Sequence, residues 1–350
     1  MKLALLLTFI FSTYAQAASY PKELPREDFE YLVVATHSFN GQIEADQVRT
    51  KGGARIGGIK NVAKYVRILR NRFKDKVILV HAGSLFKKDQ KAEEKAEILK
   101  LVGDMNYDVI FPSEQDLINH KADLDKLHAI QNNMITSNLL EPKSGEHIYK
   151  KTIVIKKKYP FQFLGLYSVN NLREKYLNPF LPGLYVKDEI TSALENINDK
   201  AKIKVVLGGF NEQCSNSNPS KLIYEWGEDP GCAKKSDIFY MMRKLPKDAV
   251  HLIINESGKP STGYLKNTII SQAHAGGRMI SLVGISYFKP HEVFDIKKSY
   301  AFRPVEVCLN IATKGSACRG ESKGFFARLF GSSDDKAENA SFLNSPIIKN

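Results

Sequence analysis

The sequence lacks an apolar stretch long enough to span a membrane, since a transmembrane helix needs about 20 apolar residues. Its one sustained apolar run, Leu3–Phe11, is shorter than that, and Lys2 precedes it. Ala15 and Ala17 follow at the spacing of a signal-peptidase site, and no Cys follows that would anchor a lipoprotein. We therefore expect residues 1–17 to be a signal peptide, the protein to be exported to the periplasm or the medium, and no transmembrane segment.

Cysteine is scarce, with four in 350 residues. The cysteines form no Cys-x-x-Cys pair and have no His pair nearby, which argues against zinc binding and leaves it as the alternative. Export would place them in an oxidising compartment, where disulfides form. Local pairing closes the shortest loops, so we expect disulfides Cys214–Cys232 and Cys308–Cys318 among three possible connectivities.

Acidic residues are also in short supply. The 38 Asp and Glu residues against 51 Lys and Arg residues give a formal net charge of +13. A basic exported protein can bind anionic polymers or lipid headgroups, although blocks as scattered as Lys87–Lys88 and Lys156–Lys158 are also typical of a solvated surface. Export and the lack of interleaved aromatic and basic residues disfavour nucleic-acid binding.

The hydrophobic content of 43% is that of a globular protein. Tyr31–Thr36 and Lys76–Val80 read as buried strands. A helix between them is predicted by apolar residues at helical spacing, namely Ile56, Ile59, Val62, Val66, Leu69 and Phe73. Two parallel strands joined by a helix place the loops that follow them at one sheet edge, where open α/β sheets carry their sites.

The rest of the chain continues this alternation, without an internal repeat. Further helices are predicted over Gln90–Asn106, Asp123–Gln131, Asp188–Asp199 and Ser236–Lys244. Further strands are predicted over Tyr107–Phe111, Met134–Leu139, Tyr149–Lys156, Phe161–Ser168, Ile203–Leu207, Val250–Ile254, Thr268–Ala273 and Met279–Phe288. We expect one domain over residues 18–318, followed by a basic, mobile tail over residues 319–350.

Several segments resemble motifs of one enzyme family. Gly52–Ile56 is similar to a Gly-Gly-x-Ala-Arg helix start, Ala82–Phe86 to an Ala-Gly-Asp-Thr-Phe loop, and Ile270–Arg278 to a Gln-Ala-Gly turn. These motifs are those of the 5'-nucleotidase-like metallophosphoesterases of the calcineurin-like superfamily, N-terminal domain only. The resemblance implies an α/β fold, a four-layer α/β/β/α sandwich of two mixed sheets of the metallo-dependent phosphatase type.

The metal-binding side chains of that family are missing at the matching positions. A two-metal phosphoesterase holds its cations with Asp, His and Asn at strand ends, so that the metals activate water. The resemblance places those positions at Ser38, Asn40, Ser84, Glu114, Gln115, Gly209, Glu256 and Gly258. Ser and Gly do not hold a divalent cation in place of Asp and His, and Gln115 stands where the catalytic His would. We therefore expect no catalytic residue, metal or cofactor, and a pseudoenzyme that acts as a binding or scaffold protein of the cell envelope.

Alternatives remain open at the sequence level. His37, His81, Glu114 and Glu256 fall at the same sheet edge and could form a rebuilt single-metal site for Mn or Zn in an active phosphoesterase. The two Glu residues could instead serve as an acid–base pair on a glycoside. In the simplest alternative, both His residues hydrogen-bond to loop backbone and both Glu side chains face solvent. An inactive cleft of small polar side chains in a basic protein would suit an anionic small ligand or an envelope component.

Overall fold

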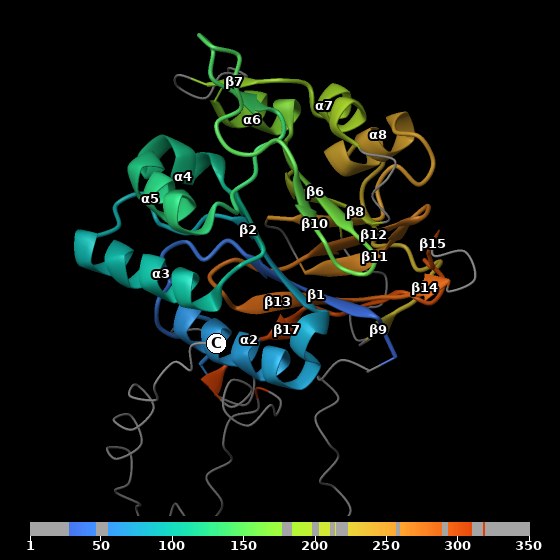
Figure 1. Cartoon of the computed structure of the whole chain (residues 1–350), viewed down its shortest axis with the longest axis horizontal. Helices are drawn as coiled ribbons and strands as arrows, with labels where there is room; N and C mark the ends of the chain where they lie inside the picture. The colour runs from blue at the N-terminus through green and yellow to red at the C-terminus, as the bar shows by residue number, and fades with distance from the viewer. Residues whose placement is uncertain are drawn as a thin grey trace, which may run out of the picture.

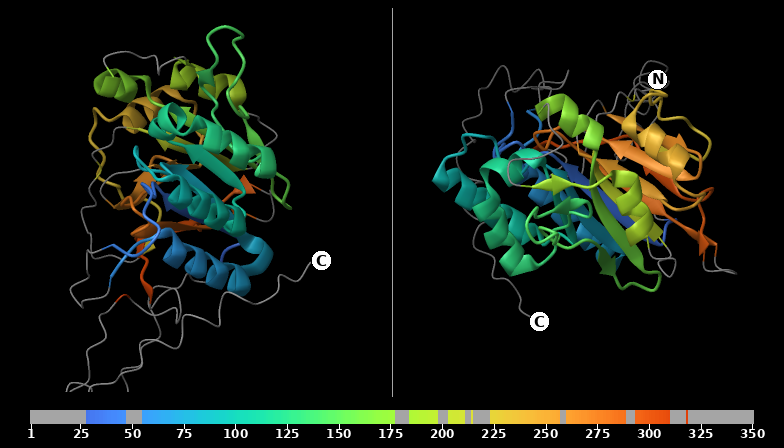
Figure 2. Two further views of the ribbon diagram at one scale, coloured as in Figure 1. Left: turned by 90° about the vertical axis from the view of Figure 1, so that its left-hand side faces the viewer. Right: turned by 90° about the horizontal axis from the view of Figure 1, so that it is seen from above.

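The computed structural model describes residues 28–46, 55–176, 184–197, 203–210, 214, 223–256, 260–288, 293–309 and 318. The expected signal peptide, the Gly52–Gly53 pair, Gly258 and the C-terminal tail lie outside these residues. Two sheets pack face to face, and helices cover the outer face of each (Figure 1). This is the predicted four-layer α/β/β/α arrangement, and the view turned about the vertical axis shows the same stacking (Figure 2, left).

The first sheet has seven strands in the order β3-β2-β1-β13-β16-β9, with β17 paired to β13. Its strands are β1 (Tyr31–His37), β2 (Val77–Gly83), β3 (Val109–Pro112), β9 (Ile223–Tyr224), β13 (Met279–Ile285), β16 (Tyr300–Phe302) and β17 (Val305–Glu306). β1, β2 and β3 are parallel, whereas β13 runs antiparallel to β1. The carboxyl ends of the three parallel strands therefore share one edge.

The helices on this side follow the parallel strands in chain order. They are α2 (Ile59–Phe73), the short 3-10 helix η1 (Lys74–Lys76), α3 (Ala92–Met105), α4 (Glu114–Asn119) and α5 (Lys121–Gln131). The prediction that Ile56 is helical is wrong. Gly57 and Gly58 adopt φ of 91° and 85°, so the helix begins only after them, and Ile56 forms a β-bridge with Cys308 instead. In α3 the buried face is formed by Ile98, Val102 and Met105.

The second sheet has six strands in the order β11-β12-β10-β8-β6-β5. Its strands are β5 (Ile153–Ile155), β6 (Phe161–Tyr167), β8 (Ile203–Gly209), β10 (Leu252–Asn255), β11 (Ser261–Leu265) and β12 (Thr268–Gln272). The outer helices are α6 (Val169–Tyr176), α7 (Glu189–Asn196) and α8 (Asp237–Lys244). The four central strands are parallel, and β5 and β11 pair antiparallel at the two edges, so the sheet is mixed as expected.

Two short pairs complete the described strands, β4 (Leu139–Leu140) with β7 (Tyr185–Val186) and β14 (Tyr287–Phe288) with β15 (Val293–Phe294). The strand predicted over Met134–Leu139 is reduced to β4 and to two single bridges, Ile110 with Met134 and Ile135 with Lys150. None of the described helices is both long and apolar enough to cross a membrane.

The core has two parts, one on each face of the second sheet. Because side chains alternate along a strand, Phe161 and Phe163 of β6 enter the core between the sheets. Leu164 and Leu166 of the same strand enter a separate core beneath α7 and α8. This two-sided burial explains why β6 reads as a continuous apolar run.

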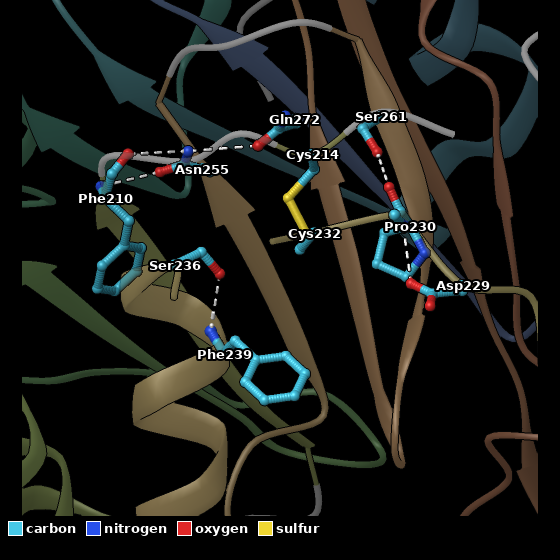
Figure 3. Close-up of a disulfide and its surroundings, with 11 residues drawn as sticks. Phe210, Cys214, Asp229, Pro230, Cys232, Ser236, Phe239, Asn255, Ser261 and Gln272 are labelled. Atoms are coloured by element: carbon cyan, nitrogen blue, oxygen red, sulfur yellow. Dashed lines mark hydrogen bonds between the residues drawn. A yellow bond between two sulfur atoms is a disulfide. The ribbon is translucent and has the colours of Figure 1, made fainter. Parts of the chain in front are cut away.

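Both predicted disulfides are formed, Cys214–Cys232 (Figure 3) and Cys308–Cys318. The zinc alternative for the cysteines is therefore wrong, because each sulfur is bonded to another sulfur. Cys214–Cys232 lies beside the ends of β8 and β10 (Figure 3). Such bonds restrict the unfolded chain and typically contribute about 2–4 kcal/mol.

Candidate functional site

The carboxyl ends of the two sheets meet, and backbone and hydroxyl groups join them directly. Ser38, which follows β1, donates its hydroxyl to the carbonyl of Glu256, which follows β10, at 3.3 Å. The backbone N–H of Ser84, which follows β2, donates to Ser38 Oγ at 3.0 Å. A Cβ added at Gly209, the last residue of β8, would lie 3.5 Å from the carboxyl carbon of Glu256. We call the group formed by Ser38, Ser84, Glu114, Asp116, Gly209 and Glu256 the strand-end junction.

Gly83 allows this close approach. It adopts a φ of +112°, which L side chains rarely take up. A Cβ at this position would lie 2.1 Å from Ser38 Oγ and 3.1 Å from Glu256 Cβ. The turn after β2 therefore requires glycine both for its backbone conformation and for the space that the Ser38 hydroxyl fills.

Asp116 is the residue of the junction that the sequence analysis missed. Ser113 caps α4 and accepts the backbone N–H of Asp116, which fixes the start of this short helix. The fully buried Asp116 carboxyl then accepts the N–H groups of Leu85 at 2.7 Å and of Phe86 at 3.1 Å. Its signal in the sequence is an acidic residue two places after Glu114, in the segment that follows β3.

The Ser84 hydroxyl lies within hydrogen-bonding distance of two acceptors. Ser84 Oγ lies 2.6 Å from the carbonyl oxygen of Phe86 and 3.2 Å from Asp116 Oδ1. A hydroxyl has one proton, so the shorter contact to the carbonyl of Phe86 is the main hydrogen bond and the contact to Asp116 is the weaker one. Burial raises the pKa of Asp116 to about 7, against the lowering effect of its backbone and serine hydrogen bonds.

Two more carboxyl groups lie near the same point. Glu114 and Glu256 are only 4% and 6% exposed, so the expectation that they face solvent is wrong. Burial raises the pKa of Tyr167 well above its usual value, and the charges of Glu114, Glu256 and Asp116 raise it further. The Tyr167 hydroxyl donates to the carbonyl of Pro112 at 2.5 Å, at the end of β3. Three buried carboxyl groups therefore act electrostatically on one buried phenol.

His37 and His81 are both fully buried and hydrogen-bonded within the sheets. The ring nitrogens of His37 lie 2.8 Å from the carbonyl of Asn255 and 2.8 Å from Ser281 Oγ. Those of His81 lie 2.8 Å from Thr36 Oγ1 and 3.1 Å from the carbonyl of Gly83. Burial lowers the pKa of His37 to about 4 and that of His81 to about 3, so both rings are neutral at pH 7.

The remaining predicted positions lie at the margin of the junction. Asn40 is exposed and takes a φ of 50°, with its backbone N–H donating to the carbonyl of Ser84 at 3.2 Å. Gln115 is half-buried on α4. The structure therefore brings together Ser38, Ser84, Glu114, Gly209 and Glu256 but not these two side chains.

Asn255, at the end of β10, was also missed. Its side chain accepts the N–H of Phe210 at 3.0 Å and donates to the carbonyl of the same residue at 3.2 Å (Figure 3). This paired contact holds the chain just after β8 against the end of β10. A polar residue at the end of an apolar strand is the signal that marks such a position.

The arrangement of two mixed sheets with their carboxyl ends meeting is shared with known structures. The chain has the fold of the calcineurin-like phosphoesterases. A 5'-nucleotidase precursor from Thermus thermophilus matches with a TM-score of 0.59 and 14% identity, over 85% of this chain and 57% of that one. A putative 5'-nucleotidase from Staphylococcus aureus matches with a TM-score of 0.58 and 12% identity, over 79% of this chain and 54% of that one.

A calcineurin-like phosphoesterase from Bacillus subtilis matches with a TM-score of 0.56 and 14% identity, over 86% of this chain and 96% of that one. The chain thus spans a little over half the length of the two 5'-nucleotidases, and it covers almost all of the phosphoesterase from Bacillus subtilis. No protein-family model matches the sequence, and no curated protein matches it. Identities this low establish the phosphoesterase fold alone.

The residues at the junction do not fit the pair of divalent cations that the phosphoesterase fold implies. Among the described residues, no group of three or more His, Cys, Asp or Glu side chains is placed to hold a metal ion. The ring nitrogens of His37 and His81 already lie at hydrogen-bonding distance from protein oxygens, so the rebuilt site with Glu114 and Glu256 is not assembled. Ser38 and Ser84 supply neutral hydroxyls where hard cations need carboxylates.

Proposed function

We propose that this protein is an exported, catalytically inactive protein of metallophosphoesterase fold that acts as a binding or scaffold protein of the cell envelope. The observation that carries the proposal is the direct hydrogen bonding of the loops after β1 and β2, in which Ser84 N–H donates to Ser38 Oγ at 3.0 Å. Groups in these two loops satisfy one another and the protein backbone. A hydrolase of this type instead needs ligands free to hold cations and a water molecule.

Export is proposed from the sequence of residues 1–17 and is consistent with the two disulfides. Disulfides persist in oxidising compartments and are rare in the cytosol of most organisms. Together these features favour the periplasm or the extracellular medium as the place of action.

For the binding partner, we favour an envelope component over an anionic small ligand at the strand-end junction. The charges of Glu114, Asp116 and Glu256 all act on Tyr167 there. An anion bound among them would meet like charge in a desolvated setting, where repulsion is strong. A larger partner would instead use the surface of the protein.

The competing function is an active phosphoesterase with a metal site rebuilt around Glu114 and Glu256. The observation in its favour is that both carboxyl groups act electrostatically on Tyr167 and so lie near the same phenol. Two carboxylates and no imidazole would be a weak ligand set for Zn and a more suitable one for Mn.

The two functions are separated by one set of measurements on the purified mature protein. Hydrolysis of 5'-nucleotides and of p-nitrophenyl phosphate is followed with Mg, Mn, Ca and Zn, together with elemental analysis and thermal melting. The proposal predicts no hydrolysis, no stoichiometric metal and no metal-dependent rise in Tm, since a ligand that binds the folded state stabilises it.

Hydrolysis that Glu114→Gln and Glu256→Gln abolish would overturn the proposal. Glu146→Gln is the matched control, because Glu146 is an exposed carboxyl outside the strand-end junction.

A further inference from the structure

The amino edge of the two sheets carries a cluster of lysines from two distant segments. Lys74 and Lys76 lie on η1, immediately before β2, and Lys156, Lys157 and Lys158 lie in the turn between β5 and β6. Lys157 Nζ donates to the carbonyl of Asp75 at 2.9 Å, which joins the two segments. We call these five residues the lysine edge. Because the strands are parallel, it lies at the opposite edge from the strand-end junction.

None of these five lysines forms an ion pair with any described residue. Lys76 Nζ donates to the carbonyl of Phe29 at 3.2 Å, and Lys158 lies over the ring of Tyr159 at 5.2 Å. Elsewhere lysines do pair with acids, as Lys95 does with Asp123 at 2.8 Å. The charges of the lysine edge are therefore not neutralised at short range within the described part of the chain.

Acidic residues also lie at this edge. Asp75 is exposed between Lys74 and Lys76, and the exposed Asp28 precedes Phe29, whose carbonyl accepts from Lys76 Nζ at 3.2 Å, so the five lysines still outnumber the exposed acids. The mostly buried Asp108 interacts electrostatically with Lys157, and its carboxylate accepts the N–H of Leu79 at 2.8 Å.

Protection of an exposed strand explains only part of this arrangement. β5 is an edge strand, and lysines on such strands prevent pairing with other chains. Lys74 and Lys76 belong to η1, which is not part of a sheet. A role that includes both segments needs a partner that attracts all five charges.

We propose that the lysine edge binds the surface of an anionic lipid membrane. A lysine ammonium is a compact point charge without the fork that binds one carboxylate or phosphate in two places. Separate charges spread over two segments suit many separate phosphate groups, whereas one small anion needs donors that converge in a pocket. Each lysine close to an anionic bilayer strengthens binding about fivefold. The binding is independent of whether the strand-end junction is catalytic.

Vesicle co-sedimentation of the full-length mature protein tests this proposal. Vesicles of phosphatidylcholine with and without phosphatidylglycerol are compared at low and high salt. We expect binding only to the anionic vesicles, weakening as salt screens the charges. The variant K74Q/K76Q/K156Q/K157Q/K158Q should bind at least about 100-fold more weakly than wild type, and about 3,000-fold more weakly if all five lysines reach the bilayer. Glutamine keeps a donor for the carbonyls that Lys76 and Lys157 contact.

The control variant K100Q/K143Q/K234Q/K235Q/K247Q removes the same charge from exposed lysines elsewhere. It should lose only a few-fold in affinity, as expected for a change in net charge alone. Equal losses in the two variants would mean that net charge drives binding, and would overturn the proposal. Absence of vesicle binding by the wild-type protein, or binding to polyphosphate or nucleic acid without binding to anionic vesicles, would overturn it as well. The phosphatase measurements are unaffected by any of these outcomes.

Discussion

The two edges of the sheets differ in how their charged and polar groups are satisfied. At the carboxyl edge, the strand-end junction buries three carboxyl groups and links Ser38 to Ser84 and to the backbone of Glu256. At the amino edge, five lysines form no ion pair with described residues. In open α/β folds the carboxyl edge is where ligands bind. Here the polar groups of the carboxyl edge hydrogen-bond to one another, whereas the lysines of the amino edge keep their charges available for a partner.

This difference has a physical basis in the turns that form each edge. The junction depends on close backbone approach, which Gly83 allows, so its groups find partners within the protein. The lysine edge depends on long flexible side chains that keep their charge in water. A substitution at the first should cost stability, and a substitution at the second should cost binding.

The largest expected effect is that of Gly83→Ala. The added Cβ would lie 2.1 Å from Ser38 Oγ in a residue with a φ of +112°, so we expect a loss of about 3 kcal/mol or more in the free energy of unfolding. Urea denaturation measures it. Gly145→Ala is the matched control, because Gly145 also has a positive φ of +72° but has no atom within 4 Å of the added Cβ. It should cost about 1–2 kcal/mol, and equal losses in both variants would show that the junction is not tightly packed.

Asp116→Ala should rank next. It removes the acceptor of the Leu85 and Phe86 N–H groups and leaves them buried, at a cost of about 3 kcal/mol. Asp116→Asn keeps an oxygen for one of them and should cost clearly less. Chemical denaturation measures the free energy of unfolding of both variants. Equal losses in Asp116→Ala and Asp116→Asn would show that the hydrogen bonds of the Asp116 carboxyl do not stabilise the junction.

The pH dependence of Asp116 gives a smaller and more specific effect. Its pKa is about 7 in the folded state and near 4 in the unfolded chain, so between these values the folded state holds one proton more. Stability therefore falls as pH rises through this window, at up to about 1.4 kcal/mol per pH unit, and levels off above about pH 8. Wild type should lose stability relative to Asp116→Asn over pH 4–7. His37 and His81 act in the opposite direction but are present in both proteins, so they cancel in the difference. A constant difference would show that Asp116 is ionised throughout.

The sequence predicts the scaffold better than the junction. Helix α2 follows from regular apolar spacing, which reflects its single buried face. The burial of Glu114 and Glu256 has no such signature, because it arises when segments far apart in the chain meet. Asp116 sits in the six-residue helix α4, which is too short to show a period. Resemblance to a family marks some of these positions in the sequence, but the hydrogen bonds among them are visible only in the fold.

The smallest stability effect should come from the lysine edge. K74Q/K156Q/K158Q removes three charges that make neither an ion pair nor a hydrogen bond with described residues, so we expect a change below about 0.5 kcal/mol in the free energy of unfolding. Removing mutual repulsion would make that change slightly stabilising, most visibly at low salt, where screening is weak. Thermal melting at two salt concentrations measures it. A loss comparable to that of Asp116→Ala would mean that these lysines maintain the fold, and the contrast between a bonded carboxyl edge and an available amino edge would fail.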